Sequence, residues 1–173
     1  MHYGRIVALV GVVIGAVGLL IKKASSDGEI ALAQLSQAPD SAFPPDLAEN
    51  TWTALYNDTA WAAIVLALAA VVVIIVALAP PFDEPMKRLF GLIATVMGVV
   101  MLLIGVFATL GAMDDADSLE AGFAQAAAAG VLPVAFAVSI GFGWYLLVLG
   151  GAIVAIGGVL SLMARPDEDA IAS

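Results

Sequence analysis

Apolar residues fill four long stretches of this sequence, and polar residues gather between them. The four stretches are Gly4–Ile21, Thr59–Ala79, Leu89–Ala112 and Val138–Ala164. Each is close to or longer than the roughly 20 residues that a helix needs to cross a bilayer core about 30 Å thick. Lipid offers the backbone no hydrogen bonds, so a spanning segment must be a helix or part of a closed barrel. Barrel strands alternate apolar and polar residues, whereas these stretches are almost continuously apolar. We therefore predict an all-α, integral membrane protein with four spans.

The polar segments divide the chain into the parts of one transmembrane domain, 1–173. The predicted order is a first span 4–21, an outer loop 22–58, a second span 59–79, an inner turn 80–88, a third span 89–112, a second outer loop 113–137, a fourth span 138–164 and a tail 165–173. Pro80 and Pro81 end the second span, because proline lacks the backbone N–H and restricts the residue before it. We expect the second and third spans to pack as an antiparallel pair.

Basic residues at the span ends predict the orientation. Four fall on one side of the arrangement and two on the other: Arg5, Lys87, Arg88 and Arg165 against Lys22 and Lys23. An excess of positive charge favours the cytoplasm. We predict cytoplasmic termini and a multi-pass protein of the plasma (cytoplasmic) membrane. Cleavage of a signal peptide is not expected, because Lys22 and Lys23 separate the first apolar stretch from any cut site.

The two outer loops carry patterns of short helices. The spacing of Ser26 and Glu29 predicts a capping box at the start of one short helix, and a second short helix is predicted at 46–57. In the second loop, Asp117 can cap a short helix that stops at Gly130, and Pro133 is a candidate early start of the fourth helix. Aromatic residues at this side predict an interfacial belt, made of Trp52, Tyr56, Trp61, Trp144 and Tyr145.

Small residues recur every seven positions in all four spans. The series are Gly4, Gly11 and Gly18; Ala63, Ala70 and Ala77; Gly91, Gly98 and Gly105; and Gly143, Gly150 and Gly157. Helices in lipid associate largely through close contact along small-residue faces. A seven-residue period keeps such a face aligned in a left-handed bundle, which is the predicted architecture. Gly11 and Gly15 also form a GxxxG motif that could serve self-association instead.

Candidate chemistry is sparse. The chain has no cysteine and a single histidine, His2, so thiolate sites and histidine-based pairs are not expected within one chain. No ionisable residue lies between the first and last turns of the predicted spans. The main polar side chains there are Thr95, Thr109, Ser139 and Ser161, each expected to bond its own helix backbone. We predict no enzyme activity and no cofactor. The net charge of −9 also makes nucleic acid an unsuitable partner.

One acidic cluster stands out in the second outer loop. It contains Asp114, Asp115, Asp117 and Glu120. Closely spaced carboxylates can bind a cation such as Ca²⁺, but the spacing lacks the glycine turn and terminal glutamate of a calcium loop. Solvated loop charge with a helix cap is the favoured interpretation, and a cation site is the weaker one.

The predicted topology resembles that of claudin-type tetraspans, which have four spans, internal termini, a larger first outer loop and a smaller second one. That family's first loop carries a Trp-Gly-Leu-Trp run followed by a cysteine pair. This chain has Asn50-Thr51-Trp52-Thr53 at the corresponding place and no cysteine. The resemblance therefore concerns topology alone, and topology does not establish function.

Three functions are compatible with these sequence features. The leading hypothesis is a non-catalytic structural or accessory subunit that packs against a larger membrane or envelope complex, with lipid and other subunits, or a second copy, as partners. The alternative is a homo-oligomeric channel or claudin-like junction protein whose acidic loops form a cation-attracting mouth, although the spans lack a polar pore stripe. An integral membrane enzyme acting on lipids ranks last, because paired His, Asp or Glu residues are missing at the interface.

Overall fold

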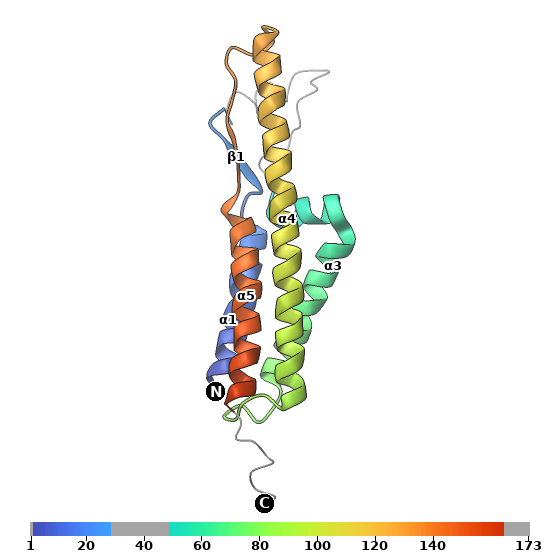
Figure 1. Cartoon of the computed structure of the whole chain (residues 1–173), viewed down its shortest axis with the longest axis vertical. Coiled ribbons are helices and arrows are strands. Elements are labelled where there is room, and N and C mark those ends of the chain that lie inside the picture. Colours follow the sequence, from blue (N-terminus) through green and yellow to red (C-terminus); the bar gives the residue numbers. More distant parts are fainter. Residues whose placement is uncertain (1, 29–48, 165–173) are drawn as a thin grey trace, which may run out of the picture.

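Four long apolar helices dominate the computed structural model, which describes residues 2–28 and 49–164 (Figure 1). They are α1 (Tyr3–Leu20), α3 (Thr51–Leu78), α4 (Arg88–Ala128) and α5 (Phe142–Met163). All four are long and apolar enough to cross a membrane, as expected of a multi-pass membrane protein. The described chain begins and ends at the same end of the bundle, since Gly4 lies against Gly157 and Ser161. We call this the Arg5 end and the opposite end the Lys23 end.

Helix α5 lies between α1 and α4 and contacts both through glycines. Its residues Gly143, Gly150 and Gly157 face α1, where they meet Gly18, Gly11 and Gly4 in antiparallel register. A Cβ atom placed on Gly150 would lie 2.7 Å from the backbone oxygen of Gly11. On the side that faces α4, the counterparts are Gly151 and Gly158. The backbones of three helices therefore touch directly, which is possible only where side chains are absent.

The remaining predicted packing residues lie on three helices. Gly91, Gly98 and Gly105 of α4 all face α5, where a Cβ on Gly98 would lie 2.7 Å from Ala155 Cα. In α3, Ala63 and Ala77 are completely buried and Ala70 is partly buried. Gly15 is buried beside Gly150. Both glycines of the GxxxG motif, Gly11 and Gly15, are therefore buried within this chain.

Arg5 joins α1 to the end of α3. Its side chain is only 1% exposed, and its guanidinium donates hydrogen bonds to the carbonyl oxygens of Ala77, Ala79 and Glu84. The last carbonyls of a helix have no partner within that helix, and a cation beside them is favoured by the helix dipole. Arg5 therefore closes the C-terminus of α3 and holds the turn that leads to α4.

Helix α3 bends at Thr59, whose backbone angles (φ −148°, ψ 69°) are not helical. The eight residues before the bend, 51–58, overlap the short helix predicted at 46–57. The sequence predicted this short helix and the second span as separate helices, whereas the structure joins them in one kinked helix. Asn50 caps its start by accepting a hydrogen bond from the Thr53 N–H at 2.8 Å. The proposed capping partner Glu29 and residues 30–48 lie outside the described residues, and Ser26 itself belongs to a strand.

The prediction of a loop at 113–117 and a separate short helix was wrong, because α4 continues to Ala128. Asp117 therefore lies inside a helix and caps nothing, although the helix does stop just before Gly130, which has φ +74°. A helix that is already formed extends at little cost, and no proline interrupts it before Pro133. The 41 residues of α4 span about 60 Å, roughly twice a bilayer core. Figure 1 shows α4 rising far beyond the other helices.

Residues 113–128 of α4, which we call the arm, pack against two short strands. The sequence predicted a short helix starting at Ser26 and a helical span starting at Val138 where these strands lie. Strands β1 (Ala24–Ser26) and β2 (Val138–Ile140) pair antiparallel, with Ser25 opposite Ser139. Helix α5 therefore starts at Phe142, and Pro133 starts no helix. The run Val-Ser-Ile favours an extended chain, and pairing gives both segments backbone partners. A small second core forms here from Ala24, Ala116, Phe123, Leu132, Phe136 and Val138.

Candidate functional site: a groove between two helices

A groove of about 930 Å³ lies between α3 and α4. The groove exists because many of the residues that line it are alanine or glycine, which leave space between the two helices. Among its lining residues are Ala54, Ala62, Ala108, Gly111, Ala112 and Ala116. A Cβ atom on Gly111 would have no neighbour within 4 Å. Figure 1 shows the upper part of α3 bowing away from α4 at the bend, so the kink at Thr59 and these small residues together leave space unfilled by the chain.

The groove changes character along its length. Its α4 wall is apolar from Val100 to Gly111, a rise of about 17 Å along a helix. Beyond this apolar part, Asp115 and Ser118 of α4 and Asp58 of α3 line it. The groove is therefore amphipathic along its axis, with one apolar and one polar part.

The polar part has an excess of negative charge. The ammonium of Lys23 forms an ion pair with Glu49, whose carboxylate oxygen lies 2.7 Å away. Asp58 and Asp115 are both exposed, and their charges repel each other, while Lys23 attracts Asp58. Since Lys23 is already paired with Glu49, a positive group entering the groove would meet two carboxylates.

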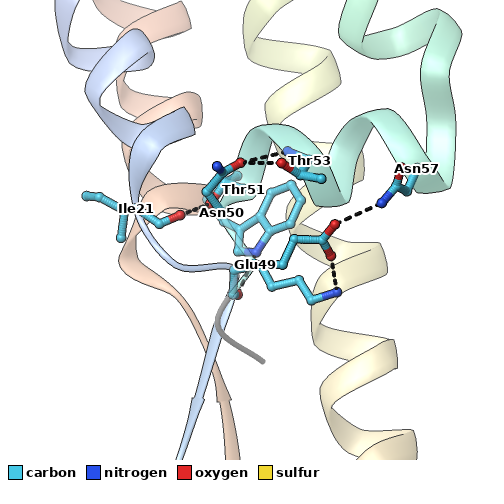
Figure 2. Close-up of polar contacts among 8 residues, drawn as sticks. Ile21, Glu49, Asn50, Thr51, Thr53 and Asn57 are labelled. Carbon is cyan, nitrogen blue, oxygen red and sulfur yellow. Dashed lines mark hydrogen bonds and ion pairs between the residues drawn. The ribbon is translucent and has the colours of Figure 1, made fainter. Parts of the chain in front are cut away.

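A network of hydrogen bonds fixes the backbone beside this polar part (Figure 2). The hydroxyl and the N–H of Thr51 both donate to the carbonyl of Ile21, at 2.9 and 2.8 Å. Asn57 donates from its amide to Glu49 at 2.8 Å. Trp144 donates from its indole N–H to the carbonyl of Lys23 at 2.9 Å. The ends of α1, α3 and α5 are thereby held together, so this side of the groove is preorganised.

Replacing Trp144 with phenylalanine is expected to lower the free energy of unfolding by about 1 kcal/mol. The change removes one buried hydrogen bond and some packing area, but the carbonyl of Lys23 keeps the N–H of Gly141 as a donor at 2.6 Å. Denaturation in mixed micelles, followed by circular dichroism, measures the effect. Trp61→Phe is the matched control, because Trp61 is 67% exposed. Equal losses for both variants would contradict the role given to the indole N–H.

The predicted aromatic belt is only partly exposed. Tyr56, Trp61 and Tyr145 have exposed rings, as an interfacial belt requires. Trp52 is partly buried and stacks on Tyr56, with ring centroids 6.3 Å apart. The placement of Trp144 in the belt was wrong, because its ring is 3% exposed and belongs to the main core.

The acidic cluster does not converge on one point. Asp114, Asp115, Asp117 and Glu120 all lie on the exposed surface of the arm, but Asp115 lines the groove while Glu120 accepts a hydrogen bond from the N–H of Val138 at 3.2 Å. Among residues 2–28 and 49–164, no group of three or more His, Cys, Asp or Glu side chains is placed to hold a metal ion.

The polar side chains expected to bond their own helices behave in two ways. The prediction is confirmed for Thr95 and Thr109, which donate to Gly91 at 2.9 Å and Gly105 at 2.7 Å. It was wrong for Ser139, which lies in β2 with its hydroxyl 3.0 Å from that of Ser25. It was also wrong for Ser161, whose hydroxyl is buried against α1 without a hydrogen-bond partner.

Sequence reasoning missed three features. Gly151 and Gly158 face α4, and the doublets Gly150-Gly151 and Gly157-Gly158, seven residues apart, were the available pattern for two faces on one helix. The hydrogen bonds from Arg5 to the carbonyls at the end of α3, which we call the clamp, were not predicted. A basic residue at the start of a span was interpreted only as a determinant of orientation. The groove itself depends on a bend that hydropathy does not reveal.

Comparison with known proteins adds no assignment: no protein-family model matches the chain, and neither a curated protein nor a solved structure shows significant similarity.

Proposed function

We propose that this chain is a non-catalytic structural or accessory subunit of a larger membrane or envelope complex, and that its arm contacts the partner. The length of the arm carries this proposal. Its 16 residues extend about 24 Å beyond the predicted third span. A helix outside the membrane is stabilised mainly by tertiary packing. In the arm, Phe123 provides such packing because its ring lies edge to face on Phe136, with ring centroids 6.1 Å apart.

The chemistry of the arm favours a basic partner. Asp114 and Asp117 are exposed and lie three residues apart, which places them on one face of the helix. Asp115 points instead toward the groove. A rigid, preformed surface loses little conformational entropy on binding, and clustered charge speeds encounter with an oppositely charged surface.

We further propose cytoplasmic termini, a left-handed bundle and residence in the plasma membrane. The gathering of Arg5, Lys87 and Arg88 at one end supports this orientation. The seven-residue spacing of the glycines supports a left-handed crossing. Labelling of single cysteines introduced at position 2 and in the arm of the otherwise cysteine-free chain tests the orientation. The position 2 cysteine should react only after the membrane is made permeable, and the arm cysteine should react in intact cells.

The proposed function predicts that neutralising the arm releases the partner. In mild-detergent purification from the native membrane, the variant Asp114→Asn with Asp117→Asn should retain roughly fivefold less of the co-purifying chain, because exposed ion pairs contribute up to about 1 kcal/mol each. The charge-preserving pair Asp114→Glu with Asp117→Glu is the matched control and should retain it. Recovery of the wild-type chain alone, or equal recovery by both double variants, would overturn the proposal.

A further inference from the structure

The proposed function leaves the α3–α4 groove unused. The groove has apolar walls where α4 lies opposite the part of α3 that follows the bend. The exposed rings of Trp61 and Phe107 flank this apolar part. An empty groove in a bilayer is unfavourable, because the atoms that line it lose van der Waals contacts. We therefore expect another molecule to occupy the groove. Its volume of about 930 Å³ is at the upper end of typical ligand sites.

The dimensions match one leaflet of a bilayer. The apolar wall from Val100 to Gly111 rises about 17 Å, and half of a hydrocarbon core is about 15 Å. The polar residues Asp58, Asp115 and Ser118 follow directly at the Lys23 end. This order of an apolar segment and then a polar one is that of a lipid lying parallel to the helices.

The charges distinguish one kind of head group from another. Asp58 and Asp115 are exposed to an incoming group, while the nearest cation, Lys23, is occupied by Glu49 at 2.7 Å. A head group that ends in an ammonium would place a positive charge between two carboxylates. A purely anionic head group would meet repulsion there.

We propose that the α3–α4 groove binds a membrane phospholipid with an ammonium head group, whose acyl chain lies along Val100–Gly111 and whose ammonium contacts Asp58 and Asp115. This site is independent of the arm surface formed by Asp114 and Asp117. A lipid held at this place would fill the gap that the bend in α3 leaves.

The head-group preference is tested by lipid retention. The full-length protein is reconstituted with equimolar phosphatidylethanolamine and phosphatidylglycerol of identical chains, re-extracted in mild detergent, and examined by native mass spectrometry. The wild type should retain phosphatidylethanolamine preferentially. Asp58→Asn with Asp115→Asn should reduce the preference roughly fivefold, in line with exposed ion pairs, whereas Asp114→Asn should leave it unchanged. Equal retention of the two lipids by the wild type, or an unchanged preference in the double variant, would overturn the proposal.

The position of the lipid is tested by filling the groove. Gly111→Leu places a side chain in the open space and should reduce total lipid retention severalfold, while Gly122→Leu, also open to space but on the arm, should not. A photoreactive residue at Leu103 should label lipid. Labelling of a second copy or of another chain would overturn the proposal. The carboxylate variants change only exposed side chains, so the test remains decisive if Gly111→Leu fails to fold.

Discussion

Replacing Gly150 with alanine is expected to disrupt the contact between α1 and α5, whereas the same change at Gly111 is expected to stabilise the protein slightly. The added Cβ at Gly150 would lie 2.7 Å from both the oxygen of Gly11 and the nitrogen of Gly15. These are backbone atoms that cannot rotate away, so the helices must separate. Overpacking of this kind costs about 1–3 kcal/mol.

The control at Gly111 works in the opposite direction. No atom lies within 4 Å of its Cβ position, and alanine is favoured over glycine within a helix by up to about 1 kcal/mol. Unfolding of each variant in mixed micelles gives the comparison. If both variants lose or gain the same stability, the close approach of α1 and α5 is incorrect.

A double variant sharpens this test. Gly11→Ala alone should also force α1 and α5 apart, because its Cβ would lie 2.7 Å from Gly150 O. Once one substitution has separated the helices, the second costs less, so the combined loss should be smaller than the sum of the two. Neighbouring residues that share one structural response are expected to be non-additive in this way. Full additivity would place the two glycines at separate contacts.

Replacing Arg5 with methionine should lower the free energy of unfolding by about 3 kcal/mol or more. Methionine keeps an unbranched apolar stem, but the carbonyls of Ala77, Ala79 and Glu84 lose the guanidinium as a donor. Each buried group left unsatisfied costs about 1–3 kcal/mol. Arg5→Lys should be intermediate, because one ammonium on a flexible stem does not match the geometry of the planar guanidinium.

The control for this prediction is Arg88→Met. Arg88 carries the same charge at the same end of the bundle, but it is exposed. Both substitutions weaken the positive charge that orients the chain, and only Arg5→Met removes the clamp on α3. Unfolding in mixed micelles, combined with proteolysis of the turn at 80–87, separates the two effects. Equal loss of stability and equal cleavage in both variants would show that Arg5 acts through charge alone.

The four helices could be predicted because membrane crossing imposes a simple rule on the sequence. A stretch such as 59–79 must be apolar and long, and hydropathy alone reports this. The extension of α4 through Asp114, Asp115 and Asp117 could not be predicted in the same way, since acidic residues are common in loops. What accompanies the extension is a small core in which Ala116 and Phe123 gather with Ala24 of β1 and Val138 of β2, and Ala24 is about 90 residues away from Ala116 in sequence.

The groove and the clamp depend on tertiary arrangement. Thr59 follows two polar residues and matched the predicted start of a span, but a bend there has consequences only because α4 presents Ala108 and Gly111 opposite it. Arg5 reaches carbonyls about 70 or more residues away in sequence, a distance at which local patterns carry no information. Sequence therefore predicts which segments enter the membrane better than it predicts what they enclose.

The position of α5 between α1 and α4 has a consequence for biogenesis. Helix α1 leaves the ribosome first of the four, yet the glycines that receive it belong to the helix made last. At about 5–20 residues per second, roughly 7–30 s of translation separate Leu20 from Met163. During that interval Gly4, Gly11 and Gly18 lack the α5 backbone that covers them in the folded chain. The contact between α1 and α5 can therefore form only after the last of the four helices has been made.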